Sequence, residues 1–423
     1  MSALLASLVA LSTPLEPTSV FAHLGADAFV NFETPHVHPI EAASGRLLAV
    51  NTASSRLMIF DLASSTPTLT HGVAVGLDPV SVRVAPDGVA WVVNHLSDSI
   101  SLVDVSSGDV VRTIPTDDEP ADVVFAGGRA FVSCAQVNRV LSFDLTDLSA
   151  SPTVIPIVGE EPRMLAVSPA GATVYAAIFE SGNNTTVLGG GLEDASTLAF
   201  PPNVVSDPTG PYGGANPPPN NGIQFSPPRS PDASQRMPVS LIVRKDEAGQ
   251  WRDDNIGNWT SLVSGAQATR SGRLPGWDLA DHDVALIDVA TNQVTYATGL
   301  MNICMALATD PSSGDVYVVG TDATNEVRFE PNLNGRFLRV NIARVDDLTL
   351  DATVVDLNPH LDYTTSTIPQ SERDRSIGDP RGIVWAGTKG FVSGMGSNNV
   401  VVIDPTGARL AEPIEVGEGP TGL

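Results

Sequence analysis

A short pattern of strand and turn residues recurs along the chain at a period of about 40 residues. The copy at 78–117 shows it best, with apolar alternations at 80–84, 89–94, 100–103 and 110–114. The turns between them are Ala85-Pro86-Asp87-Gly88, Ser97-Asp98 and Ser107-Gly108-Asp109. Alternation with period 2, bounded by Gly, Pro, Asp and Ser, predicts antiparallel strands joined by tight turns. Four such strands in about 40 residues have the size of one β-propeller blade.

Two markers delimit the copies. An acidic or small residue followed by Pro opens each copy, at Asp78-Pro79, Glu119-Pro120, Glu161-Pro162, Asp379-Pro380 and Gly419-Pro420, with His38-Pro39 as the loosest match. An apolar residue followed by Asp closes the third strand, at Phe60-Asp61, Val103-Asp104, Phe143-Asp144, Ile287-Asp288 and Ile403-Asp404. The copy from Pro162 to Asp288 is roughly 100 residues longer than the others, which predicts an insertion within it.

We therefore predict an all-β propeller of four-stranded antiparallel blades over 23–423, with a long loop insertion in blade four. The expected blades are 34–76, 77–117, 118–159, 160–301 with the insertion at 181–279, a degenerate blade at 302–361, and 377–417. The final residues, 418–423, repeat the opening of a further blade. Because a propeller that lacks a blade exposes its core, we expect a fragment of a propeller that has seven blades when complete.

The repeat resembles the YVTN-type β-propeller family, which includes YncE-like and lactonase-like seven-bladed propellers. The matching residues are Ala85-Pro86-Asp87-Gly88, Trp91-Val92-Val93-Asn94 and Ser101-Leu102-Val103-Asp104, and in the last blade Gly390-Phe391-Val392-Ser393 and Val401-Val402-Ile403-Asp404. The resemblance covers 34–423 apart from the insertion. It implies the fold more strongly than a function, because propellers carry many unrelated activities.

The insertion is rich in Gly and Pro, and this composition predicts no separate hydrophobic core. It also holds Trp251, Trp259 and Trp277, together with a predicted strand at 239–243. Loops that carry large aromatic residues pack on something, and loops on rigid scaffolds often carry function. We expect an ordered flap over one face of the propeller. The alternative is a loop that its tryptophans pin to the blade edges.

The net charge of −25 argues against a nucleic-acid partner, because binding of phosphates needs an excess of Lys and Arg. No apolar run is long enough to span a membrane. The apolar run at 3–11 and Val20-Phe21-Ala22 predict a signal peptide at 1–22 and export to the periplasm or outside the cell, although no Lys or Arg precedes the run. Cys134 and Cys304 are expected to be buried free thiols.

Candidate ligand-binding residues lie where the predicted second strands end. Alignment of the blades on the closing Asp places Asn51, Asn94, Cys134 and Gly394 at one position, and Thr52, His95, Ala135 and Met395 at the next. Residues that vary from blade to blade at a repeated site suit a binding surface, of which Asn51, Asn94, His95 and Met395 are the candidates. Drift in a loop gives the same pattern.

Three arginines follow the opening Pro of their blades, on or just before the innermost strand: Arg83, Arg163 and Arg381. Around the propeller axis they could hold an anionic ligand through bidentate hydrogen bonds. The structural alternative pairs them with acidic neighbours such as Glu161 and Asp379. Separately, His36 and His38 alternate with Val37, so both are expected on one side of an extended segment. Two imidazoles at this spacing could share a divalent metal, and a hydrogen-bonded pair is the alternative.

The leading hypothesis is an exported, non-catalytic module that recognises a protein or a small ligand at a propeller face. No nucleophile motif or Cys-x-x-Cys-His haem-attachment motif is present, so we expect no haem in this segment. Two other classes stay open. The resemblance extends to propeller domains of periplasmic c-type haem proteins, whose haem would have to lie beyond Leu423. It also extends to lactonase-like hydrolases that use a metal at the axis.

Overall fold

The computed structural model describes residues 36–188, 241–252, 258–323, 338–347, 349–363 and 368–423. The expected signal peptide lies outside these residues. Within these ranges, two short helices, α3 (Thr260–Val263) and α4 (Gln370–Arg373), and a few 3-10 turns accompany a structure made almost wholly of strands. No helix in these ranges has the length and apolar character needed to cross a membrane.

Six four-stranded antiparallel sheets follow one another along the chain. Blade one is β1 (Ile40–Ala43), β2 (Arg46–Asn51), β3 (Arg56–Asp61) and β4 (Thr68–Ala74); blade two is β5 (Pro79–Val84), β6 (Val89–Asn94), β7 (Ser99–Asp104) and β8 (Asp109–Pro115); blade three is β9 (Pro120–Ala126), β10 (Arg129–Cys134), β11 (Arg139–Asp144) and β12 (Thr153–Pro156). In each blade the strands pair in chain order.

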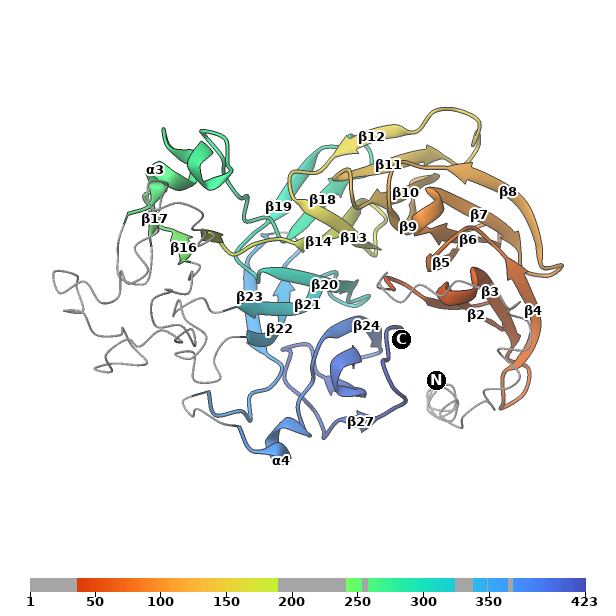
Figure 1. Cartoon of the computed structure of the whole chain (residues 1–423). Coiled ribbons are helices and arrows are strands. Elements are labelled where there is room, and N and C mark those ends of the chain that lie inside the picture. Colours follow the sequence, from red (N-terminus) through yellow and green to blue (C-terminus); the bar gives the residue numbers. More distant parts are fainter. Residues whose placement is uncertain (1–35, 189–240, 253–257, 324–337, 348, 364–367) are drawn as a thin grey trace, which may run out of the picture.

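The second half of the ring contains the insertion. Blade four is β13 (Glu160–Val167), β14 (Thr173–Glu180), β18 (Val284–Asp288) and β19 (Val294–Ala297); blade five is β20 (Ile303–Thr309), β21 (Val316–Ala323), β22 (Leu338–Val345) and β23 (Ala352–Asp356); blade six is β24 (Pro380–Ala386), β25 (Lys389–Gly394), β26 (Asn399–Ile403) and β27 (Ile414–Glu415). Figure 1 shows the blades arranged around a common axis. The predicted all-β propeller, with its insertion between the second and third strands of blade four, is confirmed.

Packing between blades follows from the alternation in each strand. Leu48 and Leu57 of blade one contact the apolar cluster that contains Val82 and Val92 of blade two, and all four are fully buried. Because successive residues of a strand point to opposite faces, each sheet carries apolar side chains on both faces. A fully buried Val or Leu contributes about 1.5–3 kcal/mol, so the blades stabilise one another mainly through these contacts.

A repeated backbone feature explains the markers read from the sequence. The residue before the opening Pro has a left-handed backbone in four blades, with φ of +51° at Asp78, +54° at Glu119, +58° at Glu161 and +49° at Asp379. In three of these blades its carbonyl accepts a hydrogen bond from the turn that follows the second strand: His95 N donates to Asp78 O at 2.9 Å, Ala135 N to Glu119 O at 2.9 Å and Met395 N to Asp379 O at 3.0 Å. The conformation is uncommon for residues other than Gly, and Asp is one of the side chains that tolerates it best.

A side-chain hydrogen bond ties a blade to the start of the next segment at three places. The acceptors are the Oδ1 atoms of Asp98, Asn138 and Asn398, which lie 3.1, 2.9 and 3.0 Å from the backbone N of Glu119, Glu161 and Gly419, respectively. Gly419 also shares the left-handed φ, at +63°. Residues 419–423 are therefore tied to blade six by the same kind of hydrogen bond that ties the inner strands of blades three and four to the blades before them.

Six four-stranded blades are described, and the sheets do not close into a ring. Seven blades in the complete propeller stay a prediction. Residues 419–423 lie between blade six and blade one, as the C label in Figure 1 indicates. The Thr421 hydroxyl lies 3.0 Å from His36 Nδ1, ahead of blade one. A Cβ on Gly422 would lie 2.8 Å from Pro39 Cγ, so this approach requires glycine. The C-terminal residues thus connect the two blades that no sheet joins.

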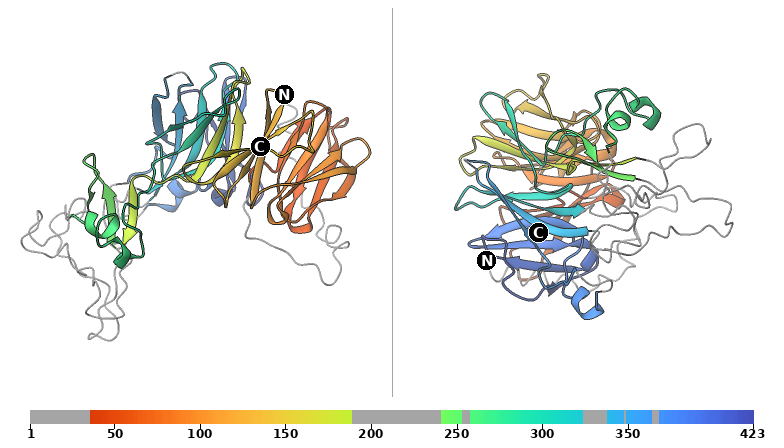
Figure 2. Two further views of the ribbon diagram at one scale, coloured as in Figure 1. Left: turned by 90° about the horizontal axis from the view of Figure 1, so that it is seen from above. Right: turned by 90° about the vertical axis from the view of Figure 1, so that its left-hand side faces the viewer.

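The described part of the insertion forms a small module of its own. Strands β15 (Thr185–Leu188), β16 (Leu241–Lys245) and β17 (Trp251–Arg252) make a three-stranded sheet, and α3 lies against it. Val243, Trp251, Leu262 and Val263 form its core, and the Trp251 and Trp277 rings lie 5.8 Å apart. Figures 1 and 2 show the module projecting from the edge of the ring.

Two expectations about the insertion were therefore wrong for its described residues. It does have a separate core, and its tryptophans belong to that core or pack against it, in a module that projects from the propeller edge instead of covering a face. The physical reason is that each Trp buries some 150–250 Å², so a few of them suffice for a small core despite the Gly-rich and Pro-rich composition around them. The expectation for the cysteines is confirmed, because Cys134 and Cys304 are buried and free.

Replacement of Asp98 tests the bond between blades. Asp98→Ala removes the acceptor for Glu119 N and places Ala at a φ of +46°. We expect the free energy of unfolding to fall by about 1–2 kcal/mol. Asp98→Asn keeps both the acceptor and the tolerance of left-handed backbone, so it should cost less than about 0.5 kcal/mol. Chemical denaturation measures both values, and equal losses in the two variants would contradict the interpretation.

Candidate functional site: an axial cavity

A cavity of about 590 Å³ lies where the inner strands of the blades meet. Residues of β1, β5, β9, β13, β20 and β24 line it, together with the segment before β1 and the last residues of the chain. The lining residues come from the C-terminal halves of β5, β9, β13 and β20, such as Val124 and Leu307. A site assembled from separate blades on rigid strands keeps its shape better than one built on a single loop.

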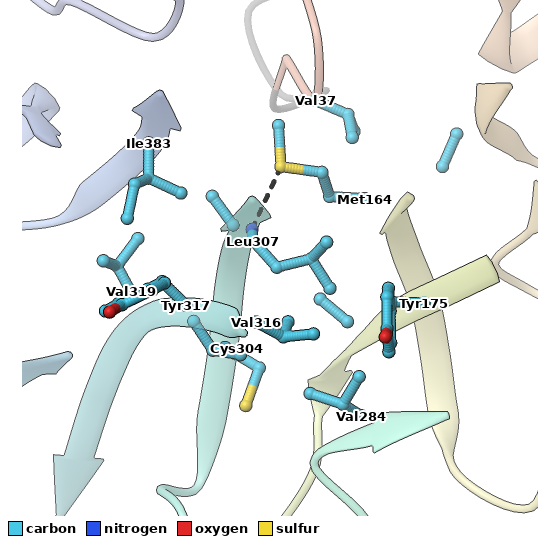
Figure 3. Close-up of a cluster of buried hydrophobic side chains, with 14 of the residues drawn as sticks. Val37, Met164, Tyr175, Val284, Cys304, Leu307, Val316, Tyr317, Val319 and Ile383 are labelled. Atoms are coloured by element: carbon cyan, nitrogen blue, oxygen red, sulfur yellow. Dashed lines mark hydrogen bonds between the residues drawn. The ribbon is translucent and has the colours of Figure 1, made fainter. Parts of the chain in front are cut away.

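The lining is mostly apolar. Met164, Leu307 and Ile383 belong to the large buried cluster that Figure 3 shows around the axis, and Phe125 and Trp385 add aromatic surface. The Leu307 N–H donates a hydrogen bond to Met164 Sδ at 3.2 Å, which ties blade five to blade four at the cavity wall. Only three of the lining side chains are titratable: His38, Glu41 and Arg83. The cavity is thus an apolar chamber with one polar corner.

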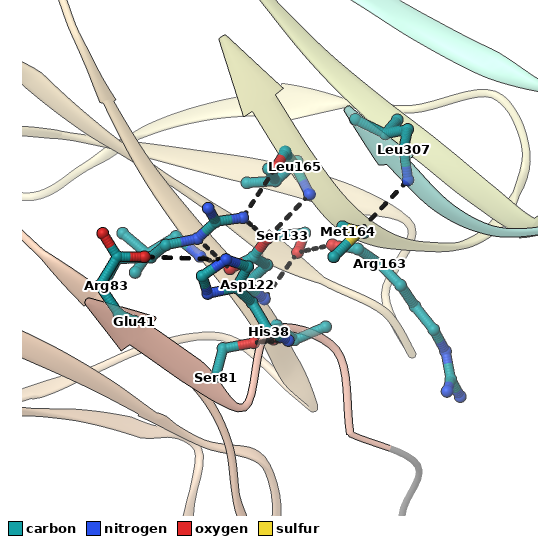
Figure 4. A network of polar contacts seen from close by, with 12 residues as sticks. His38, Glu41, Ser81, Arg83, Asp122, Ser133, Arg163, Met164, Leu165 and Leu307 are labelled. Carbon is teal, nitrogen blue, oxygen red and sulfur yellow. Dashed lines mark hydrogen bonds and ion pairs between the residues drawn. The ribbon is translucent and has the colours of Figure 1, made fainter. Parts of the chain in front are cut away.

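The polar corner depends on a buried carboxylate. Asp122 of β9 is fully buried, and Arg83 of β5 donates to both of its oxygens, from Nε at 3.2 Å and from Nη2 at 2.8 Å. The same carboxylate accepts from the backbone N–H groups of Val123 and Leu165, and Arg83 Nη2 also donates to the Leu165 carbonyl. Figure 4 shows this network across blades two, three and four. A buried charge needs such complete pairing, because its desolvation is costly.

His38 and Glu41 make up the rest of the corner. His38 Nδ1 lies 3.1 Å from the Val82 carbonyl, and His38 Nε2 lies 3.7 Å from Glu41 Oε2. Burial, and after it the nearby Arg83 guanidinium, lower the pKa of His38 to about 4. Burial raises the pKa of Glu41 above its ordinary value. His38 is therefore a neutral hydrogen-bonding group at neutral pH.

The three arginines from the sequence do not line one cavity. Arg83 alone lines the cavity. Arg163 pairs with Glu161 at 2.8 Å and lies over the Phe179 ring, 4.4 Å from its centre, and Arg381 pairs with Asp379 at 2.8 Å. These pairs lie at the opposite, N-terminal ends of their inner strands. Each arginine has an acidic partner, as the structural alternative predicted.

The residues at the ends of the second strands also lie away from the cavity lining. Asn51 Oδ1 accepts from Ser54 N in the turn after β2, and Asn94 Nδ2 donates to Ser101 Oγ at 3.0 Å. His95 Nδ1 lies 3.1 Å from the Pro120 carbonyl, with Glu119 at 3.7 Å from Nε2. Met395 lies in the 3-10 turn after β25. Ligand binding at these four residues stays a prediction.

His36 and His38 have different surroundings. His36 Nε2 lies 2.6 Å from Thr52 Oγ1, which donates to the Pro79 carbonyl, so Nε2 carries the hydrogen and Nδ1 accepts from Thr421. Burial lowers the pKa of His36. In the described part of the chain, no group of three or more His, Cys, Asp or Glu side chains is placed to hold a metal ion. A metal shared by the two histidines stays a prediction.

Sequence reasoning missed Asp122, Glu41 and Trp385. Asp122 carried a usable signal, since it is a lone charged residue directly before Val123-Val124 in an otherwise apolar inner strand. Glu41 and Trp385 carried none, because nothing local indicates that β1 and β24 line one cavity.

Comparisons with known proteins support the fold. No family model matches the chain, and no curated protein matches it. A solved structure of hydrazine synthase from Kuenenia stuttgartiensis is similar over 94% of this chain and 92% of that chain, with 16% identity and a TM-score of 0.56. A solved structure of virginiamycin B lyase from Staphylococcus aureus is similar over 92% of this chain and 87% of that chain, with 10% identity and a TM-score of 0.46. A protein of unknown function from Desulfotomaculum acetoxidans is similar over 91% of this chain and 87% of that chain, with 11% identity and a TM-score of 0.47.

Fold and comparisons together define the chain as a β-propeller. At 16% identity the likeness to the hydrazine synthase chain is one of fold alone. The YVTN-type resemblance stays an interpretation of the repeat residues.

The lowered pKa of His38 predicts a pH dependence of stability. In the unfolded chain His38 takes up a proton below about pH 6.5, whereas in the folded chain it stays neutral down to about pH 4. The contribution of His38 to the free energy of unfolding is therefore fully present above pH 6.5. It is lost as the pH falls toward 4, and the loss is on the order of 2–3 kcal/mol.

His38→Asn keeps a donor for the Val82 carbonyl but does not titrate. We expect the melting temperature of the natural chain to fall more between pH 7 and 4.5 than that of the variant. Thermal melts of both proteins over this pH series measure the difference. Parallel curves would show that His38 is not kept neutral by burial.

Proposed function

We propose that this β-propeller is a non-catalytic recognition module that binds a small, largely apolar molecule in its axial cavity. The supporting observation is the cavity itself, whose 590 Å³ falls within the range of about 300–1,000 Å³ typical of small-molecule sites. Its lining has the composition of such sites, with mostly apolar and aromatic walls and a few converging polar groups. Recognition of a protein at a propeller face is the other form of the hypothesis, and the cavity favours the small ligand.

The groups that line the cavity suit binding better than covalent chemistry. Arg83 is committed to Asp122, and His38 Nδ1 is committed to the Val82 carbonyl. The two cysteines lie outside the cavity lining, and both are poor nucleophiles, because burial raises the pKa of Cys134 to about 12 and that of Cys304 well above its ordinary value. Blades from all around the ring hold the walls in place, so little conformational entropy is lost when a ligand enters.

An uncharged fluorescent probe, N-phenyl-1-naphthylamine, tests the cavity. We expect saturable binding at one site per chain, seen as enhanced probe fluorescence. Ala308→Phe on β20 and Val384→Trp on β24 fill the cavity and should each weaken binding at least tenfold. Ala352→Phe is the matched control, since Ala352 is exposed on the outer strand β23 and lies outside the cavity lining. Circular dichroism checks that each variant is folded. Equal binding in all four proteins would refute the axial site.

We also propose that the module acts outside the cytoplasm. The support is the apolar run at 3–11 and the small-residue pattern Val20-Phe21-Ala22. Expression of the whole chain in a Gram-negative bacterium should yield periplasmic protein that begins at His23. Intact mass and N-terminal sequencing of fractionated cells measure this. A cytoplasmic product that retains Met1–Ala22 would contradict it.

A further inference from the structure

We infer that the axial cavity selects a small apolar molecule that carries a protonated primary amine, with Glu41 and His38 as the acceptors of its N–H groups. The inference rests on the proposed function, because it names the ligand class of the same cavity. It follows from the hydrogen-bonding capacity and the charge at the polar corner.

The tautomer of His38 follows from its contact with the Val82 carbonyl. The Val82 carbonyl can only accept, so His38 Nδ1, 3.1 Å away, carries the hydrogen. A neutral imidazole has one N–H, so Nε2 presents a lone pair. His38 belongs to the cavity lining, and Figure 4 shows it beside Glu41 at the polar corner.

A gap separates two hydrogen-bond acceptors at the polar corner. Glu41 Oε2 lies 3.7 Å from His38 Nε2, which is too long for a direct hydrogen bond. No described residue donates a hydrogen bond to either atom. The two acceptors would make an angle of roughly 80° at a nitrogen placed about 2.8–2.9 Å from both, which two N–H groups of an ammonium can span with bent hydrogen bonds. The corner is thus complementary to a donor with more than one N–H.

The charges at the polar corner favour a cationic ligand. The Arg83 guanidinium is neutralised by Asp122 at 2.8 Å and also donates to the Leu165 carbonyl. Among the described residues, only the neutral His38 lies within ion-pair distance of the Glu41 carboxylate, and burial of that carboxylate opposes its ionisation. A bound ammonium would supply the missing positive charge, whereas a carboxylate ligand would add a second negative one. The net charge of −25 also favours a cationic ligand over an anionic one at long range.

The rest of the cavity wall suits a ligand with an apolar body. Away from the polar corner, Phe125, Leu307 and Trp385 present apolar and aromatic surface to the cavity. Burial of an apolar body against them supplies affinity at about 25 cal/mol per Å² before the costs of association. The amine would then fix its orientation. Arylalkylamines combine both features in one small molecule.

Isothermal titration calorimetry with 2-phenylethylamine tests the inference, because 2-phenylethanol and 3-phenylpropionate have similar bodies with neutral and anionic ends. At neutral pH the amine should bind at least tenfold more tightly than the alcohol, and the carboxylate most weakly. Glu41→Gln removes the charge while it keeps the shape, and should abolish the preference for the amine without weakening the alcohol. Glu415→Gln changes the net charge equally at an exposed residue of β27 and should leave the preference intact.

The outcomes separate the inference from the proposed function. If N-phenyl-1-naphthylamine binds in the cavity but the amine has no advantage over the alcohol, the amine inference is wrong and the recognition site stands. The same holds if the advantage survives in Glu41→Gln, or if the carboxylate binds best. If neither the naphthyl probe nor the amine binds, both are wrong.

Discussion

Burial of two apolar faces on every sheet is the constraint on which this structure depends. A four-stranded sheet with apolar side chains on both faces must be covered on both sides, and identical repeats meet that demand when each sheet covers the next. The fully buried contacts of Leu48 and Leu57 with blade two are one instance. The Oδ1 atoms of Asp98 and Asn138 then fix where the next inner strand begins. Ring geometry follows from packing, and side-chain hydrogen bonds set its register.

The cavity is a consequence of the same geometry. Inner strands that converge on an axis cannot all fill it, so their last residues enclose a space that side chains from several blades share. Most of that space is apolar because inner strands are apolar. The exception is the corner where Asp122, buried within β9, requires Arg83 as a partner. His38 and Glu41 reach this corner because the segment before β1 runs alongside β5, through the bridge between His38 and Ser81.

The insertion shows that composition and packing can disagree. Its Gly and Pro content predicted no core, yet Trp251, Leu262 and Val263 form one with Val243. A core can be small when its members are large. The candidate residues show a related limit. Position within the repeat correctly placed Asn51, Asn94 and Gly394 at the ends of second strands. It could not tell which end of the inner strands holds a cavity, so Arg163 and Arg381 were grouped with Arg83 although only Arg83 lines it.

The sequence alone determined the propeller, because strand alternation and turn residues are local and the repeat multiplies their signal. It also placed the four strands of blade two to within one residue at each end. Only the tertiary structure decided the site. The pairing of Arg83 with Asp122 joins two blades, and the approach of His38 to the Val82 carbonyl depends on how blade one docks on blade two. Such contacts arise from convergence around an axis, which no local pattern encodes.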